Sequence, residues 1–459
     1  AYNVAVGAEA GKAVTTGTLN TLIGGLAGDA ITTANNNVAI GYEALTATTT
    51  ANSNTAVGTY SGNSNTTGVA NASLGAASFL TNTTGSYNTA LGGDSLRSNT
   101  TASNNTAVGY NTLRANTTGA NNVGIGVGTL KDNTTGTTNT ALGSEALNNN
   151  TTAANNVAIG ADALYTNTTG ASNVAVGAGA LLANTTASNN TAVGKGSMLR
   201  NTTGAANTAV GFESLLVNTT GANNTALGDN ALNVSTTASN NTAVGKDALA
   251  ANTTGAQNTA SGTYALATNT TGASNVAMGY NSLGANTTAV NNTAVGFRSL
   301  QENTTGTQNT AVGALSLDAN TTGAYNAAFG YSALSANTTG ERNTALGNEA
   351  LKFNTTGLRN IAVGLDCLLS NTSGSYNVSL GYGALSLNTT ADNNTAVGYS
   401  ALATNTTGAV NVAVGRLALN ASTTASSNTA IGNAALYLTT TGANNVAVGS
   451  SAGDTITTG

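Results

Sequence analysis

The feature that most constrains this chain is a 17-residue period that runs through it without an insertion or deletion. Stepping forward by 17 residues from Gly7 meets glycine every time as far as Gly449, and the same walk from Asn3 to Asn445 always meets asparagine. Since 27 units of 17 residues make 459, the repeat accounts for the whole chain. Uninterrupted short repeats are typical of solenoids, in which each unit forms one coil.

A typical unit, residues 239–255, reads Ser-Asn-Asn-Thr-Ala-Val-Gly-Lys-Asp-Ala-Leu-Ala-Ala-Asn-Thr-Thr-Gly. Seventeen residues are too few for a helical-hairpin repeat, which needs about 33. The unit holds two short pieces rich in Val, Thr and Leu, each bounded by Gly or Asn, as strands usually are. We therefore predict an all-β protein, a parallel β-solenoid (a β-roll or β-helix) of 27 coils, with one 17-residue repeat and two short strands in each coil.

The absence of length variation has a physical explanation. Each coil of a solenoid bonds its backbone to the coils on either side, so an extra residue must bulge out or break the register. We expect residues 1–459 to form one continuous repeat array without separate caps. At a strand spacing of about 4.8 Å, 27 coils would make a rod on the order of 130 Å long.

Two positions of the unit, numbered 1 to 17 from Ala1, are predicted to form the core. Position 6 is apolar in every unit except the one with Ser261, and position 11 is Leu, Met or Phe in 23 units. Val244 and Leu249 represent these positions in the typical unit. Stacked from coil to coil, such residues form apolar ladders.

Position 5 is unexpected, because it points away from position 6 and is nevertheless Ala in 23 units. A strand position that faces water should vary and accept Lys, Glu or Thr. A uniformly small residue indicates that a second surface packs closely there. One hypothesis places a neighbouring chain at this surface, as in a trimer; the alternative is a tight two-layer interior within one chain.

The remaining invariant positions are predicted to form turns and side-chain ladders. Position 3, as in Asn3, Asn105 and Asn241, should form an internal amide ladder at a corner, because no acidic residue accompanies it as a ligand site would require. Position 7 should be a turn that only glycine can make. The second turn begins at position 14. The glycines and the second-turn asparagine that represent these turns are Gly7, Gly109, Gly245 and Asn252.

Two sequence patterns suggest modification or binding at the surface. Asn-Thr-Thr matches the acceptor pattern for N-glycosylation at Asn116, Asn167 and Asn269, although turn and ladder chemistry also explains it. All 14 Tyr occupy the variable positions of the unit, which are predicted to face solvent. Exposed Tyr could contact cell-surface glycans or represent simple surface variation.

The chain lacks the residues of most catalytic and metal sites. There is no His, which removes His-based triads and metal sites, and a single Cys cannot supply a zinc site. Cys367 occupies position 10, where Ala or Ser is usual, and is predicted to be a small buried thiol. Asp and Glu are scattered over different units. We predict no catalytic residue, no metal, no cofactor and no enzymatic activity.

Charge and hydropathy limit the partners further. The net charge is −5 and basic residues do not cluster, so we expect no nucleic-acid partner. No run of 18 apolar residues is present, so we expect no membrane span. Residues 1–4 lack the basic and apolar regions of a signal peptide.

The segment Asn241-Thr-Ala-Val-Gly, followed by Ala248-Leu249 and Asn252-Thr-Thr-Gly255, resembles the repeat arrays of phage tail-fibre-like and bacterial surface fibre proteins. It also resembles the motif in the head β-rolls of trimeric autotransporter adhesins. The resemblance covers all units and implies a shaft or spacer around binding tips.

The expected function is therefore structural: an extracellular fibre or filament shaft that holds or spaces adhesive parts of a cell-surface or virion appendage. The expected partner is the chain itself, as a lateral trimer or by end-to-end stacking, since the array starts and stops in phase. Two alternatives remain open, namely a functional amyloid of a biofilm matrix and an ice-binding solenoid with a flat Thr ladder.

Overall fold

A computed structural model describes residues 2–458, and every regular element in them is a short β-strand. Each coil contributes one strand of three residues, at positions 4 to 6 of the unit. The strands are β1 (Val4–Val6), β2 (Thr21–Ile23), β3 (Val38–Ile40), β4 (Thr55–Val57), β5 (Ala72–Leu74), β6 (Thr89–Leu91), β7 (Thr106–Val108), β8 (Val123–Ile125), β9 (Thr140–Leu142), β10 (Val157–Ile159), β11 (Val174–Val176), β12 (Thr191–Val193), β13 (Thr208–Val210), β14 (Thr225–Leu227), β15 (Thr242–Val244), β16 (Thr259–Ser261), β17 (Val276–Met278), β18 (Thr293–Val295), β19 (Thr310–Val312), β20 (Ala327–Phe329), β21 (Thr344–Leu346), β22 (Ile361–Val363), β23 (Val378–Leu380), β24 (Thr395–Val397), β25 (Val412–Val414), β26 (Thr429–Ile431) and β27 (Val446–Val448).

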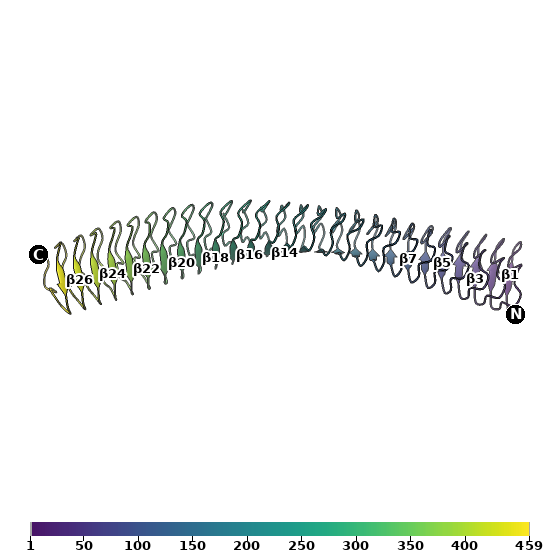
Figure 1. The fold of residues 1–459 in the computed structure, drawn as a ribbon, viewed down its shortest axis with the longest axis horizontal. Coiled ribbons are helices and arrows are strands. Elements are labelled where there is room, and N and C mark those ends of the chain that lie inside the picture. The colour runs from purple at the N-terminus through teal and green to yellow at the C-terminus, as the bar shows by residue number, and fades with distance from the viewer. Residues whose placement is uncertain (1, 459) are drawn as a thin grey trace. The chain divides into compact units, whose positions relative to one another are not determined.

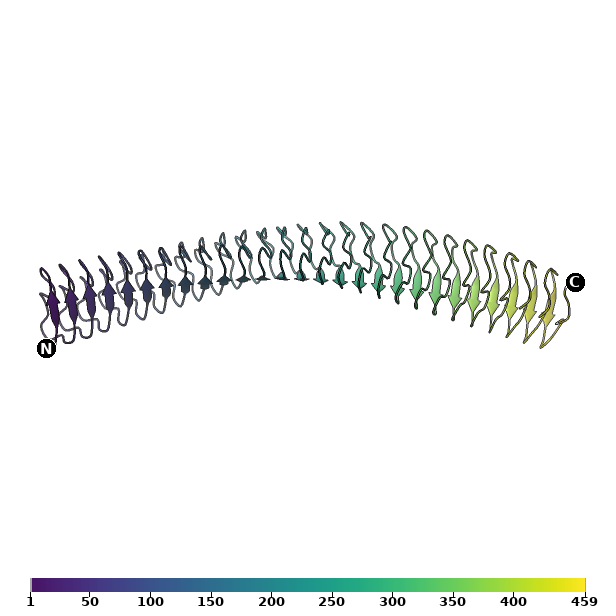
Figure 2. The same ribbon diagram turned by 180° about the vertical axis from the view of Figure 1, so that it is seen from behind.

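The chain divides into two compact units, Ala1–Asp229 with β1 to β14 and Asn230–Gly459 with β15 to β27. Within each unit, every strand pairs in parallel with the strand of the next coil, offset by one repeat, as Ala192 pairs with Ala209. Figures 1 and 2 show the strands of each unit following one another along one side of the coils. The predicted all-β parallel solenoid with one repeat per coil is confirmed. A single continuous array without caps stays a prediction.

The predicted second strand of each coil is absent, and this part of the prediction is wrong. The segment around position 11 is wound as turns, in which positions 9 and 11 have positive φ. In the typical coil, Asp247 has φ 55° and Leu249 has φ 51°. A strand requires extended backbone at each residue, so left-handed residues two apart exclude it. The local sequence, Ala-Leu flanked by variable residues, does not reveal this conformation.

The two sides of the strand are also reversed relative to the prediction for position 6. In β2 to β27 the middle residue, at position 5, is buried, whereas no residue at position 6 is buried in any of the described strands. Ala243 is fully buried, while 39% of the neighbouring Val244 is exposed. Leu249 is fully buried, so position 11 does belong to the core. The prediction that Val244 lies in the core is therefore wrong.

The reversal follows from the narrow interior of such a short coil. The strand faces the Leu ladder across a single layer, and only a small side chain fits opposite Leu249. Position 5 is buried by its own chain, which confirms the tight interior within one chain and removes the reason for placing a neighbouring chain at this position. A lateral trimer stays a prediction.

The second coil has no Leu at position 11 and fills its interior from other positions. In the second coil, position 11 is Gly28, while Leu22 replaces the usual Ala at position 5 and Ile31 replaces Asn at position 14. A Cβ added at Gly28 would lie 2.8 Å from both Leu22 Cδ2 and Ile31 Cδ1. Both aliphatic side chains are fully buried. The interior volume is therefore conserved although the residues that supply it change.

Both the backbone conformation and the lack of space beside the next coil explain why position 7 is always glycine. Gly92 has φ 132°, which only glycine adopts readily, and an added Cβ would lie 2.5 Å from the carbonyl oxygen of Gly109 in the next coil. Its neighbour Gly93 has neither restriction, because an added Cβ would make only ordinary contacts, with the Tyr110 side chain at 3.5 Å and the carbonyl oxygen of Ala76 at 3.9 Å. This adjacent pair provides a matched test.

Gly92→Ala is expected to destabilise its unit by about 2 kcal/mol or more, because the residue must leave its backbone conformation and the next coil must move. Gly93→Ala is expected to change the free energy of unfolding by less than about 0.5 kcal/mol. Urea unfolding followed by circular dichroism measures both. Equal effects of the two substitutions would contradict this account of the glycine turn.

Candidate functional site

The most elaborate chemistry is a pair of buried asparagines that share one carbonyl group, found in the coils that carry Asn at both position 3 and position 14. In the typical coil, Asn241 Nδ2 and Asn252 Nδ2 each donate a hydrogen bond of 2.9 Å to the carbonyl oxygen of Gly255. Both side chains are fully buried. The two amides approach from positions 3 and 14 and close the coil at position 17. A coil of different length could not bring these three groups together.

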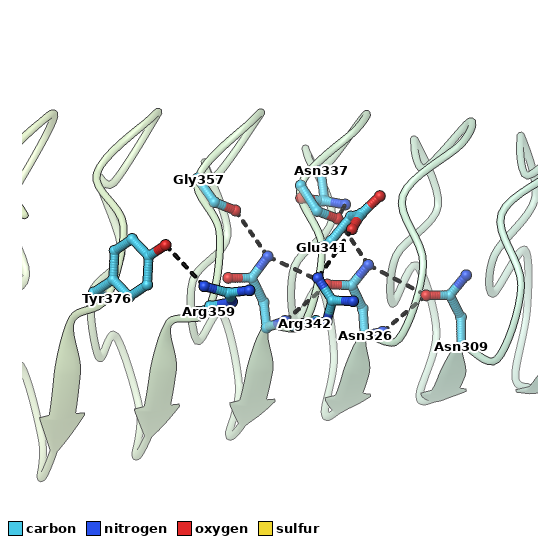
Figure 3. Close-up of polar contacts among 10 residues, drawn as sticks. Asn309, Asn326, Asn337, Glu341, Arg342, Gly357, Arg359 and Tyr376 are labelled. Atoms are coloured by element: carbon cyan, nitrogen blue, oxygen red, sulfur yellow. Dashed lines mark hydrogen bonds and ion pairs between the residues drawn. The ribbon is translucent and has the colours of Figure 1, made fainter.

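The same amides bond each coil to the next. Asn241 Oδ1 accepts a hydrogen bond of 2.9 Å from the backbone N–H of Asn258, and Asn252 Oδ1 accepts one of 2.8 Å from Asn269 Nδ2. Figure 3 shows this ladder at Asn326, whose backbone and side-chain nitrogens both donate to Asn309 Oδ1. At Asn3 and Asn105, the two other sequence-predicted ladder residues, Nδ2 likewise donates to the carbonyl oxygen at position 17 of the same coil.

A row of threonines adds a second type of ladder beside the amides. Thr253 donates to the carbonyl oxygen of Thr270 twice, once from its backbone N–H and once from Oγ1, at 2.9 Å in each case. The N–H of Thr254 reaches the same oxygen at 3.3 Å. The position-15 hydroxyls therefore donate their hydrogens to the neighbouring coil.

The amide ladder is interrupted where position 14 is not Asn. Asn405 Nδ2 bonds to Asn388 Oδ1 in the preceding coil, but Asn405 Oδ1 is buried without a hydrogen-bond partner because the next coil has Ser422. Ser422 Oγ is also buried without a partner. A hydroxyl on a short side chain does not span the gap that an amide spans.

The asparagines that match the glycosylation pattern belong to this buried ladder. Asn116, Asn167 and Asn269 are fully buried, and each Nδ2 donates to an asparagine oxygen of the preceding coil and to a carbonyl oxygen of its own coil. A sugar on any of these nitrogens would replace one of the two donated hydrogens and needs space that the folded coil does not have. Attachment to the folded solenoid is therefore sterically excluded.

The outer face of the strands is uncharged in every repeat, and its position 6 is apolar in all but one. Positions 4 and 6, which point outward, carry Thr, Val, Ile, Leu, Ala, Met, Phe and one Ser, and no charged residue in any of the 27 units. Exposed large residues of this outer strand face include Leu74, Leu142, Met278, Leu346 and Leu380. The sequence could have revealed this face, because the lack of charge at both positions is visible in the repeat.

Aromatic residues gather at the turn after the strand, at position 8. Tyr280 and Phe297 stack with ring centroids 5.6 Å apart, and Tyr382 and Tyr399 stack at 5.4 Å. These rings are about half exposed. They lie on the surface, as predicted for the variable positions.

Among residues 2–458, no three His, Cys, Asp or Glu side chains lie close enough to bind a metal ion together. Cys367 is buried, and its Sγ lies 2.8 Å from Ser379 Oγ. Burial raises the pKa of the Cys367 thiol, which disfavours the reactive thiolate. In the same range, no helix is long and apolar enough to span a membrane. The lack of enzymatic activity stays a prediction.

Comparison with known proteins identifies no family for this chain. No family model matches the chain, and no curated protein matches it by sequence.

Ser422→Asn is expected to stabilise its unit by about 1 kcal/mol, because the new amide can donate to Asn405 Oδ1 and to the carbonyl oxygen of Ala425. Asn388→Ser is the matched control with the opposite sign, because it creates the same interruption in an intact part of the ladder. Chemical denaturation compares the three proteins. A neutral or destabilising effect of Ser422→Asn would show that the ladder does not limit stability there.

Proposed function

We propose that this chain is a structural protein, the shaft of an extracellular fibre or filament. The observation that carries the proposal is the coil-to-coil amide ladder, in which the recurring buried asparagines bond along the axis and surround no open site. Such an arrangement favours axial cohesion. The resemblance of the repeat to those of surface and tail-fibre-like proteins supports a position outside the cell, on a cell or virion.

The outer strand face is proposed to associate with a second copy of this chain. With about 3.3 Å per residue and about 4.8 Å between strands, each strand presents about 50 Å² of outer face. The 14 strands of the first unit then present on the order of 650 Å², close to the roughly 800 Å² that each partner buries in a standard protein interface. The exposed apolar side chains at position 6 run along this face, and contiguous exposed apolar surface often marks an interaction site.

A second copy fits this face better than an unrelated protein for two reasons. Only a surface with the same spacing along the axis can keep its side chains in register with those of many successive coils. The face also has no charge to be paired or repelled, so two identical faces meet without electrostatic cost. Side-by-side chains would cover the residues at position 6 that the fold leaves exposed.

The observed contacts do not favour the two alternative functions, a functional amyloid and an ice-binding protein. The strands already pair within each unit, which is the pairing an amyloid would seek between chains. For the ice-binding alternative, the hydroxyl hydrogens of one of the two threonine rows are committed within the protein, because the position-15 hydroxyls donate to carbonyl oxygens.

Phe329→Lys combined with Leu346→Lys is expected to abolish lateral association, because two adjacent charges would be buried unpaired in the outer strand face. The control, Tyr331→Lys with Asn348→Lys, places the same charges in the same two coils at exposed position 8. Sedimentation measures the number of chains, and electron microscopy shows the particle and its axial repeat.

The wild type and the control are expected to sediment as several chains and to show an axial repeat of about 4.8 Å. The outer-face variant is expected to sediment as one folded chain. A wild type that stays a single chain at every concentration would contradict lateral association, and particles without an axial repeat would contradict the shaft.

A further inference from the structure

The corner of the coil formed by positions 1 and 2 of the repeat carries charged side chains at only one place along the array. Across positions 1 and 2 of all 27 repeats, only four side chains are charged. They lie within four consecutive coils of the compact unit Asn230–Gly459: Glu341, Arg342, Arg359 and Asp392. The two arginines occupy position 2 in adjacent coils, and position 2 of the coils on either side is Tyr325 and Tyr376. The sequence of side chains along this corner is therefore Tyr, Arg, Arg, Tyr.

The tyrosines hold the two guanidinium groups. The Arg342 guanidinium lies over the Tyr325 ring, 5.2 Å from its centroid, and that of Arg359 lies over the Tyr376 ring at 5.4 Å. Arg359 Nη1 also donates to the Tyr376 hydroxyl at 2.9 Å, as Figure 3 shows. Each arginine packs against the tyrosine on its outer side, so both guanidinium groups are fixed with space between them.

The charges at this corner are only partly neutralised. Arg342 pairs with Glu341 at 3.5 Å across exposed side chains. Asp392 Oδ1 accepts a hydrogen bond of 2.6 Å from the backbone N–H of Ser375. Within the described part of the chain, no carboxylate forms an ion pair with Arg359. Arg359 therefore carries an exposed positive charge beside a second one.

Folding does not require arginine here. Position 2 has positive φ in each of these coils, 57° at Arg342 and 56° at Arg359, and Asn, which accepts this conformation better, occupies position 2 in ten other units. Placing two like charges in neighbouring coils adds repulsion. The structure gives these side chains no buried contact that offsets these costs.

We propose that Tyr325, Arg342, Arg359 and Tyr376 form a binding site for an acidic sugar, a pyranose that carries a carboxylate or sulfate group. Guanidinium groups bind such oxyanions through paired N–H bonds, and fixing the fork in advance reduces the entropy lost on binding. The half-exposed tyrosine rings beside them, with exposed Leu358 in between, offer apolar contact to the sugar ring.

Two other anionic partners fit the corner less well. An extended peptide would need free backbone groups, but the N–H groups of Arg342, Arg359 and Tyr376 already bond to carbonyl oxygens of the preceding coil. Nucleic acid needs a broad basic surface, whereas residues 230–459 hold six basic and eight acidic side chains. A single charged group on a sugar needs only this local pair of arginines.

The test measures binding of an oligogalacturonate to the full chain by calorimetry at low ionic strength. Arg359→Gln is expected to weaken binding about ten- to hundredfold, because it removes charged hydrogen bonds to the ligand. The matched control is Arg298→Gln, which alters a single arginine beside an aromatic ring, Phe297, elsewhere in the same unit. Its affinity is expected to equal that of the wild type.

The ligand series separates the sources of the anionic group. A neutral galactose oligomer is expected not to bind, and a sulfated galactose oligomer compared with the oligogalacturonate decides between sulfate and carboxylate. Thermal unfolding verifies that each variant is folded. No binding of either acidic oligomer to the wild type, equal loss in both variants, or equal binding of the neutral oligomer would overturn the proposal.

Discussion

The structure depends on one repeated arrangement, two asparagine side chains that donate to the same carbonyl group. In every coil with Asn at both positions 3 and 14, the groups equivalent to Asn241, Asn252 and Gly255 meet, so the numbers of residues between them are fixed there. The oxygens of the same two amides accept hydrogen bonds from the next coil. An inserted or deleted residue in one coil therefore leaves polar groups unpaired in two neighbouring coils. A buried polar group without a partner costs about 1 to 3 kcal/mol. This cost explains why the repeat contains no insertion.

The glycine turn and the alanine-lined interior follow from the same compact coil. Neighbouring coils lie so close together at position 7 that there is no space for a Cβ. The interior of each coil is so narrow that the buried Leu249 is matched by the small Ala243 on the strand. In the coil of Gly28, where the leucine is missing, larger residues at other positions restore the volume. The larger strand residues at position 6 are placed on the outside, which gives the solenoid an uncharged outer strand face.

The sequence predicted the features that depend on periodicity. A period that never slips implies coils in register, and invariant Asn and Gly imply ladders and turns. It did not predict which side of the strand is inside, because Ala243 and Val244 are both apolar and hydropathy favours the larger one. It also did not predict that Leu249 sits in a turn, since a positive φ at leucine has no signal in its neighbours. The shared carbonyl could not be predicted, because it joins residues at three separate positions.

Position-by-position comparison of the repeats separates two kinds of surface. The outer strand face is alike in all units, which suits contact with another periodic surface over many coils. The corner with Arg342 and Arg359 departs from the repeat in one place, which suits a local ligand. A repeat array makes such departures easy to recognise, because the other coils show what the fold alone requires.

The central claim is that the buried amides, rather than apolar burial, hold successive coils in register. Asn252→Asp tests it most directly, because the side chain keeps its shape but loses both hydrogens donated by Nδ2. The account predicts a loss of about 3 kcal/mol or more in the free energy of unfolding at pH 7, measured by urea denaturation. The loss should shrink near pH 3, where a neutral carboxyl group can again donate one hydrogen bond to Gly255. A change of less than about 0.5 kcal/mol at pH 7 would contradict the claim.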